Sequence, residues 1–208
     1  MVEKISKKIL NILSDENDNE EQREILLFGI TKIVEDIPKY IAIITICLLL
    51  GVIKEFGLFM LVTMMYKTFT GGVHSHTNVG CFIVTLLSTL ICIYFPKVMV
   101  KFQSTLTPFF IFVYIFSLYI IWVYVPADVP EIPVINEKRR KRDKIMALII
   151  LNLLFIISFL FIKNTVNICI TMMTILEIDI MTTRLMYKLF KNEYGYETYV
   201  PDELLMTE

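Results

Sequence analysis

The sequence is poor in the residues that most often carry catalysis or build disulfide frameworks. It contains only two histidines, His74 and His76, and four cysteines that show no Cys-x-x-Cys spacing. Three of those cysteines lie inside apolar stretches, where a free thiol behaves as a small hydrophobic side chain. These shortages argue against a disulfide-stabilised domain and leave few side chains for any chemistry.

The sequence also lacks a strong net charge. Its formal net charge is -1, but acidic residues gather in residues 15–24 and basic ones in residues 138–144. This balance gives no case for binding nucleic acid. The first residues include no compact apolar segment followed by a small-residue cleavage site, so no removable signal peptide is predicted.

Hydrophobic side chains are abundant instead. They make up 56% of the 208 residues, and the mean hydropathy is +0.65. A water-soluble domain of this size does not need so many, so the composition predicts that a lipid bilayer surrounds much of the surface. The length suits one helical bundle with little left for a second domain.

The first third of the sequence predicts helices that only partly resemble membrane spans. Residues 4–13 have the pattern of an amphipathic helix on a membrane surface or of a soluble N-terminal helix. A second apolar-faced helix is predicted to start at Ile25 and to end near Pro38. The uncharged runs 40–53 and 56–66 are short, so each is either a full span or one arm of a re-entrant hairpin.

Three longer apolar runs follow, at residues 79–95, 102–125 and 145–162, and each is long enough to cross a bilayer. The last run, 165–186, contains Glu177, Asp179 and Arg184. Because charges are costly in hydrocarbon, these side chains are expected to face the bundle interior or to pair, unless the helix ends early.

The predicted fold is therefore all-α, a polytopic transmembrane bundle of about six membrane segments, of which the first two form either spans or a short re-entrant hairpin. We expect one domain over residues 1–208. It would consist of amphipathic helices on the cytoplasmic face (1–38), the membrane bundle (39–187) and a cytoplasmic tail (188–208). By the positive-inside rule the basic loop 126–144 is cytoplasmic, and counting helices places the segment 71–81 on the same face of a multi-pass cell-membrane protein.

One segment, residues 70–81, combines the groups that acyl chemistry needs: a nucleophile, a base and donors for an oxyanion. Cys81 stands at the predicted start of a helix, where the helix dipole would favour a thiolate. His74 or His76 could serve as general base. In one continuous helix His74 and Cys81 would stand about 10.5 Å apart, so the helix must break between them. The residues best able to allow the turn, and to offer N–H groups to an oxyanion, are Gly71, Gly72 and Gly80.

Less chemical interpretations stay open at this point. Cys81 could be a packing residue, and His76 could be a solvated loop residue or one ligand of a metal ion, although no second cysteine or carboxylate lies nearby in sequence. The whole chain could be a non-enzymatic small transporter or assembly protein. An acid protease using Glu177 and Asp179 is disfavoured, because side chains two residues apart on a helix diverge.

The segment Tyr66-Lys67-Thr68-Phe69-Thr70-Gly71-Gly72-Val73-His74, with Cys81 seven residues later and Pro126-Ala127-Asp128 ahead of a basic cluster, resembles the accessory gene regulator B (AgrB) family of membrane cysteine endopeptidases. The similarity extends to length and to the number of apolar segments. Lys67 and Thr68 stand where members of that family generally carry one or two arginines.

The resemblance implies that Cys81 and His74 form the catalytic pair and gives His76 no such role. It also implies the substrate, an AgrD-type propeptide whose C-terminal tail is removed through a thioester on the enzyme before ring closure to a thiolactone or lactone. No cofactor or metal is expected, and the partners are the propeptide and the bilayer. Gly71, Gly72, Gly80 and Lys67 are candidates for substrate or oxyanion binding, and a homodimer is left open.

Overall fold

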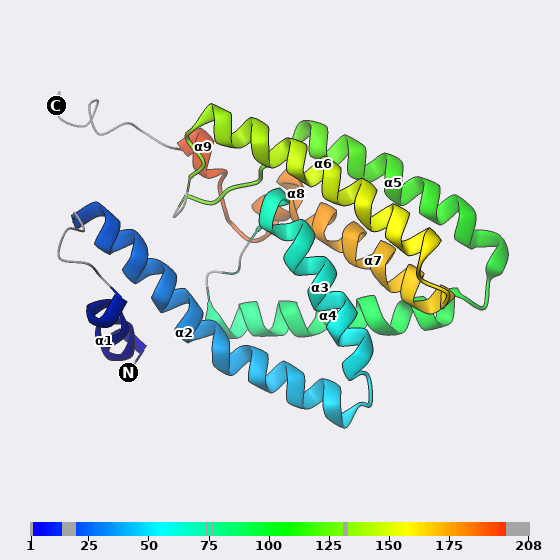
Figure 1. Cartoon of the computed structure of the whole chain (residues 1–208), viewed down its shortest axis with the longest axis horizontal. Coiled ribbons are helices and arrows are strands. Elements are labelled where there is room, and N and C mark those ends of the chain that lie inside the picture. Colours follow the sequence, from blue (N-terminus) through cyan, green and yellow to red (C-terminus); the bar gives the residue numbers. More distant parts are fainter. Residues whose placement is uncertain (1, 14–19, 74, 76, 131–132, 199–208) are drawn as a thin grey trace. The chain divides into compact units, whose positions relative to one another are not determined.

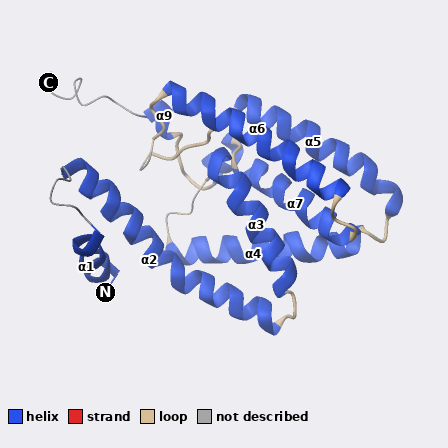
Figure 2. Cartoon of the chain, in the orientation of Figure 1, coloured by secondary structure: helices blue, strands red, loops and turns tan. Residues whose placement is uncertain are grey.

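The computed structural model describes residues 2–13, 20–73, 75, 77–130 and 133–198. All regular structure within these ranges is helical, as predicted (Figures 1 and 2). The contacts divide the chain into two compact units, Met1–Ile53 and Lys54–Glu208. Each unit is described separately below.

The first unit contains two helices, α1 (Val2–Leu13) and α2 (Glu20–Leu49). The N-terminal helix is confirmed. The expected bounds of the second helix are wrong, because α2 begins at Glu20 rather than Ile25 and continues through Pro38 instead of ending near it. A proline inside a helix removes one backbone hydrogen bond, and the other hydrogen bonds of this 30-residue helix remain on both sides of Pro38. The helix ends where Gly51 adopts a φ of 69° and Val52 N–H donates to the Cys47 carbonyl, a typical glycine-based helix end.

The second unit is a helical bundle. Its long helices are α3 (Ile53–Thr70), α4 (Asn78–Met99), α5 (Leu106–Val123), α6 (Glu137–Leu160) and α7 (Thr165–Met181). A short 3-10 turn, η1 (Gln103–Thr105), precedes α5, and the short helices α8 (Arg184–Leu189) and α9 (Gly195–Thr198) follow α7. Four of the long helices, α3, α5, α6 and α7, supply a common apolar core that includes Val62, Tyr66, Val113, Leu151 and Ile175.

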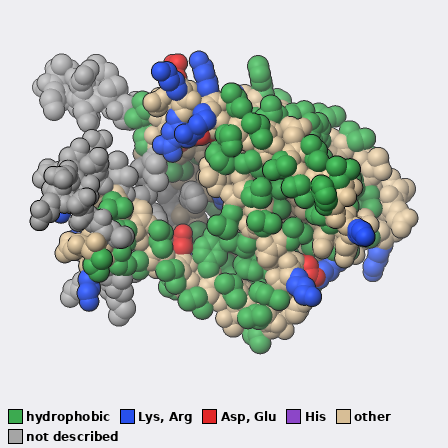
Figure 3. Space-filling model, viewed as in Figure 1, with side chains coloured by type: hydrophobic (Ala, Val, Ile, Leu, Met, Phe, Trp, Pro, Cys, Tyr) green, Lys and Arg blue, Asp and Glu red, His purple; other side chains and the backbone are tan. Residues whose placement is uncertain are grey.

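The helices α4 and α6, and α5 together with η1, are long and apolar enough to cross a membrane. They coincide with the three longer runs identified in the sequence. Their outward surfaces are rich in large hydrophobic side chains, as Figure 3 shows for the face in view. The chain is thus a membrane protein by composition and by helix length.

The basic residues do not lie in a loop, contrary to the prediction. They occupy the first turns of α6, which begins at Glu137 after the helix cap Asn136, whose side chain accepts from the N–H groups of Lys138 and Arg139. Basic side chains are unfavourable near the positively charged end of the helix dipole at a helix start. The negative charges of Glu137 and Asp143 offset part of this repulsion. Figure 3 shows the Lys and Arg side chains gathered over this end of α6.

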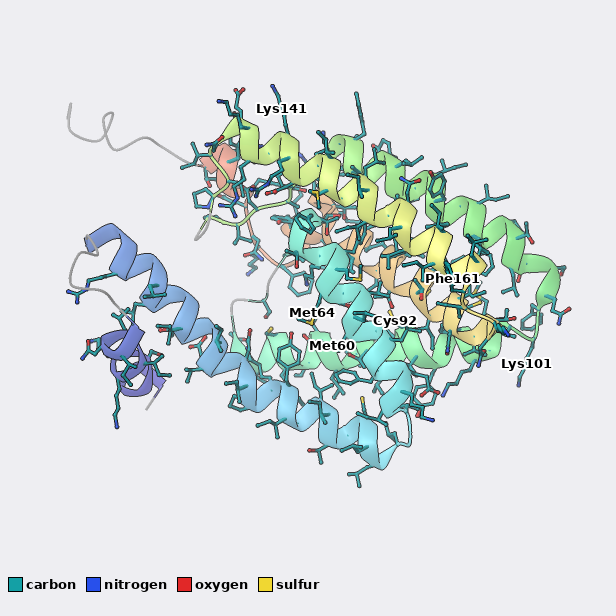
Figure 4. The ribbon with its side chains drawn as sticks, viewed as in Figure 1. Met60, Met64, Cys92, Lys101, Lys141 and Phe161 are labelled. Carbon is teal, nitrogen blue, oxygen red and sulfur yellow. The ribbon has the colours of Figure 1, made fainter. Side chains whose placement is uncertain are left out.

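Polar contacts define the two ends of the bundle. At one end Lys97, late in α4, pairs with Glu55, early in α3, at 3.0 Å. At the other end the residues after α3 and after α5 meet, close to the start of α6 and the end of α7. Figure 4 shows the same two ends, with Lys141 at one and Lys101 and Phe161 at the other. The glycine-rich segment and the basic cluster therefore lie at the same end.

The acidic residues of the last apolar run face inward, as predicted. Asp179 is fully buried, and Glu177 is half-buried and accepts a hydrogen bond from Ser88 on α4 at 2.8 Å. The helix also ends early, at Met181, so Arg184 lies beyond it and pairs with Glu197. Glu177 and Asp179 point to different neighbouring helices, which agrees with the argument against a carboxylate pair.

Candidate active site

The glycine pair that follows α3 is joined to the segment after α5 by backbone hydrogen bonds. Gly72 N–H donates to the Ala127 carbonyl at 2.9 Å, and Ala127 N–H donates to the Thr70 carbonyl at 2.8 Å. Gly71 and Ala127 thereby form an isolated parallel bridge. The chain leaves α3 along a fixed path, with its backbone groups paired.

The next residue, Val73, is also fixed. Its N–H donates to the carbonyl of Met181, the last residue of α7, at 3.0 Å. Its side chain is buried in a small apolar cluster with Ala127 and Tyr187, against which Tyr194 also packs. The residue that immediately precedes His74 is therefore held by both its backbone and its side chain.

This path requires glycine. Gly71 has a φ of 74° and Gly72 a φ of 133°, values that side-chain-bearing residues rarely adopt. A Cβ added at Gly71 would lie 2.1 Å from the Ala127 carbonyl oxygen. The glycine pair is thus more than a loop hinge, because it permits the close backbone approach to Ala127.

Two tyrosines that follow α7 in the sequence, Tyr187 and Tyr194, pack beside Val73 and Ala127. The Tyr187 hydroxyl donates to the Asp128 carbonyl at 3.0 Å, and the Tyr194 hydroxyl donates to the Thr182 carbonyl at 2.6 Å. Burial raises the pKa of both phenols, so both remain protonated donors at neutral pH. The Tyr187 and Tyr194 rings stack with centroids 4.1 Å apart.

Asp128 links Tyr187 to the start of α6, because its backbone carbonyl accepts from Tyr187 and its carboxylate accepts from Arg140. Its Oδ2 accepts from the Val134 N–H at 2.7 Å and from the Arg140 guanidinium at 3.4 Å, and its side chain is 2% exposed. Arg140 also lies over the Tyr196 ring, 4.2 Å from the centroid. One member of the basic cluster is thus structural, because it neutralises a buried carboxylate.

Cys81 lies where the sequence predicts, in the first turn of α4. Thr77 caps this helix with an extended backbone, and its Oγ1 accepts from the Gly80 N–H at 3.0 Å. The Cys81 N–H donates to the Thr77 carbonyl at 2.9 Å. All four cysteines are free, but Cys47, Cys92 and Cys169 are buried and Cys81 is half-exposed. Cys81 is therefore the thiol that a substrate can reach most easily.

His74 and His76 lie outside the described residues. The interpretation that the helix breaks between His74 and Cys81 is nevertheless confirmed, because Ser75 is not helical and α4 begins only after Thr77. The prediction that Gly80 helps to make this turn is wrong, because Gly80 lies within α4. A Cβ there would come within 2.3 Å of Ser75 Oγ and 2.7 Å of Thr77 Oγ1, so a side chain at this position would require both hydroxyls to shift.

The predicted oxyanion donors already have acceptors within the chain. Gly71 N–H donates to the Lys67 carbonyl at 2.9 Å, while Gly72 and Gly80 donate to Ala127 and Thr77 as described above. A role for these amides in binding an oxyanion would require those bonds to be replaced, and it stays a prediction. The Lys67 side chain is half-buried close to Gly72 and makes no ion pair within the described part of the chain.

Two features of the site were not found from the sequence, namely the contact with Met181 and the cover by Tyr187. Both use backbone carbonyls or apolar packing, which leave no motif. Among the described residues no group of three or more His, Cys, Asp or Glu side chains is arranged to hold a metal ion.

The family model and the curated relatives that match this chain all carry the description AgrB or AgrB-like. A sequence model of the family described as accessory gene regulator B matches residues 4–182. Two AgrB-like proteins of Clostridium perfringens, from strains 13 / Type A and SM101 / Type A, are each 28% identical over 165 residues, which is 77% of this chain and 77% of each relative. An AgrB-like protein of Clostridium beijerinckii is 25% identical over 186 residues, covering 88% of this chain and 92% of the relative. No solved structure matches the chain significantly.

Replacing Gly71 by Ala should destabilise the protein. The left-handed φ costs a side-chain-bearing residue about 1–2 kcal/mol, and the clash with the Ala127 carbonyl adds to that cost. We expect a lower midpoint of thermal unfolding for the purified protein in detergent.

Gly57→Ala is the matched control for this change. Gly57 lies inside α3 with no atom within 4 Å of an added Cβ, and alanine is about 1 kcal/mol better than glycine in a helix interior. Its unfolding midpoint should be unchanged or higher. Equal midpoints for Gly71→Ala and the wild type would contradict the requirement for glycine.

Proposed function

The chain belongs to the accessory gene regulator B family, and from this membership we propose that it is a membrane cysteine endopeptidase that processes a quorum-sensing propeptide. Membership associates the protein with the agr quorum-sensing system and, in general terms, with peptide processing. The proposed substrate is an AgrD-type propeptide, from which the enzyme removes the C-terminal tail before closing a thiolactone or lactone ring.

The observation that best supports this proposal is the position of Cys81. It is the one half-exposed thiol of the chain, and it lies in the first turn of a membrane helix, seven residues after His74. The segment that leads to His74 is fixed by Gly72 and Val73. A structural cysteine would gain nothing from such a surrounding, whereas a nucleophile needs an accessible thiol and a base delivered from a defined direction.

The proposed reaction has two acyl-transfer steps. In the first, His74 takes the proton of the Cys81 thiol, the sulfur attacks the scissile carbonyl, and His74 returns the proton to the amine of the departing tail. In the second, a thiol or hydroxyl of the propeptide attacks the resulting thioester and its proton passes to His74, so that Cys81 leaves as a thiolate and is reprotonated. Thiol exchange is nearly balanced in energy, so no cofactor is required.

The membrane would also contribute to catalysis. We propose that α2, α3 and α7 cross the bilayer together with α4, α5 and α6, which gives six crossings with both termini in the cytoplasm. The cluster of basic residues at the start of α6 favours the cytoplasmic side for this end of the bundle. Residues 71–73 lie at this end, and so does the start of α4, because the late part of α4 pairs with Glu55 at the opposite end. An amphipathic propeptide leader on the inner leaflet would then be concentrated near Cys81.

The first test concerns the two proposed catalytic residues. Cys81→Ala and His74→Ala should each abolish propeptide cleavage in reconstituted liposomes, because one removes the nucleophile and the other the base. His76→Ala, two residues away in the same segment, should retain measurable activity and serves as the matched control. Full cleavage by Cys81→Ala would contradict the mechanism, because the nucleophile would then lie elsewhere. Absence of cleavage by the wild type would favour a non-enzymatic transporter or assembly role.

The second test concerns sidedness. A membrane-impermeant maleimide added outside intact cells should leave Cys81 unmodified and should label it once the inner face is opened. The other three cysteines are buried and should contribute little background. Lys101→Cys in a Cys81→Ala background is the control, since exposed Lys101 lies at the opposite end of the bundle and should be labelled from outside. Labelling of Cys81 from outside would reverse the proposed orientation.

The third test separates acyl transfer from simple hydrolysis. A propeptide whose internal Cys or Ser is replaced by Ala should lose its tail but remain attached to Cys81, because the proposed ring-closing nucleophile is held close to the thioester and is expected to react faster than water. Mass spectrometry of the enzyme should detect the adduct, and hydroxylamine should release it. Rapid release of linear, hydrolysed peptide would mean that ring closure occurs elsewhere.

A further inference from the structure

A carboxylate without an assigned role is buried inside the second unit. Asp179 on α7 accepts a hydrogen bond from the Tyr66 hydroxyl on α3 at its Oδ1, at 2.9 Å. Its Oδ2 accepts a hydrogen bond from the Ser117 hydroxyl on α5. All three residues have no exposed surface. One buried side chain therefore ties together three helices of the bundle.

Asp179 cannot itself touch a substrate in this arrangement. Both carboxylate oxygens have partners, and neither the acid nor the two hydroxyls reach the surface. A buried carboxylate is costly without partners, so its presence in an apolar helix indicates that the contacts it makes are needed.

The bond to Tyr66 lies close to both attachments of the segment that precedes His74. Tyr66 stands one helical turn before Thr70, whose carbonyl accepts the Ala127 N–H. Asp179 stands two residues before Met181, whose carbonyl accepts the Val73 N–H. The Tyr66–Asp179 bond thus fixes the register of α3 against α7. It lies within about one helical turn of the two attachments, the Thr70–Ala127 and Val73–Met181 hydrogen bonds.

The bond to Ser117 lies further along the chain from the attachments of the segment. Ser117 lies ten residues before Ala127, and the end of α5 intervenes between them. The two hydroxyls therefore donate to the same carboxylate, but only one of them belongs to an element that carries the glycine pair.

We propose that Asp179 is a positioning residue for the catalytic segment. Through Tyr66 it holds α3 and α7 in the register at which Val73 meets Met181, and so fixes the backbone of the residue that precedes His74. This inference rests on the proposed function. A misplacement of a catalytic group by about 1 Å can cost roughly 100-fold in rate, so a modest slip of α3 against α7 would matter.

Tyr66→Phe and Ser117→Ala are a matched pair for the test, because each removes one hydroxyl from the same carboxylate. Tyr66→Phe should lower kcat for propeptide cleavage about tenfold or more with little change in KM, whereas Ser117→Ala should keep kcat within about threefold of the wild type. Both variants should show similar decreases in the midpoint of thermal unfolding. Asp179→Asn, which keeps an acceptor for Tyr66, should retain more activity than Asp179→Leu.

A measurement that does not depend on cleavage separates this inference from the proposed function. Hydrogen exchange of a peptide spanning residues 71–77 should be faster in Tyr66→Phe than in Ser117→Ala, because the Gly72 and Val73 amides would be bonded less persistently. Equal exchange in the two variants, or kcat losses that simply follow the unfolding midpoints, would overturn the positioning role. If the wild type cleaved no propeptide but the exchange rates differed as expected, the proposed function would fail and the structural link would stand.

Discussion

The exchange of backbone hydrogen bonds between Thr70, Gly72 and Ala127 is the contact on which the rest of the site depends. A chain that leaves a helix exposes unpaired N–H and C=O groups, which are costly wherever water is scarce. Here the segment after α5 supplies the missing partners, and only glycine permits its approach. Because the backbone conformation at Gly71 sets the path of the chain, the Val73 N–H can reach the Met181 carbonyl at the end of α7. The chain therefore leads toward His74 from a fixed Val73.

Much of the fold was predictable because an uncharged apolar run of membrane length is seldom anything but a membrane helix. The helices α4 and α6, and α5 with its short 3-10 turn, coincide with the three longest runs. Two boundaries were wrong for physical reasons. Pro38 predicts a helix end only when the lost hydrogen bond is not tolerated, and α2 continues through it. The basic residues 138–142 suggested a loop, but the Asn136 cap and the acidic Glu137 allow α6 to begin before them.

The candidate site was predictable only where it depends on side-chain type. The position of Cys81 at the start of a helix and the break before α4 were predicted from residues 70–81, and the structure confirms both. The bonds to Ala127 and Met181 could not be predicted, because any residue can offer a backbone carbonyl. The prediction that Gly80 makes the turn is wrong, because Gly80 lies within α4, where its N–H donates to the Thr77 cap.

Polar side chains set the register of this bundle. Helices in lipid gain little from apolar contact with one another, since the surrounding chains are equally apolar, and apolar surfaces tolerate sliding. A hydrogen bond between two helices forms at only one relative position. Such bonds join Lys97 to Glu55 near one end, Ser88 of α4 to Glu177 of α7 along the bundle, and Tyr66 to Asp179 near the other end. This use accounts for the acids inside α7 without a catalytic role, whereas the half-exposed thiol of Cys81 is not explained by packing in the bundle core.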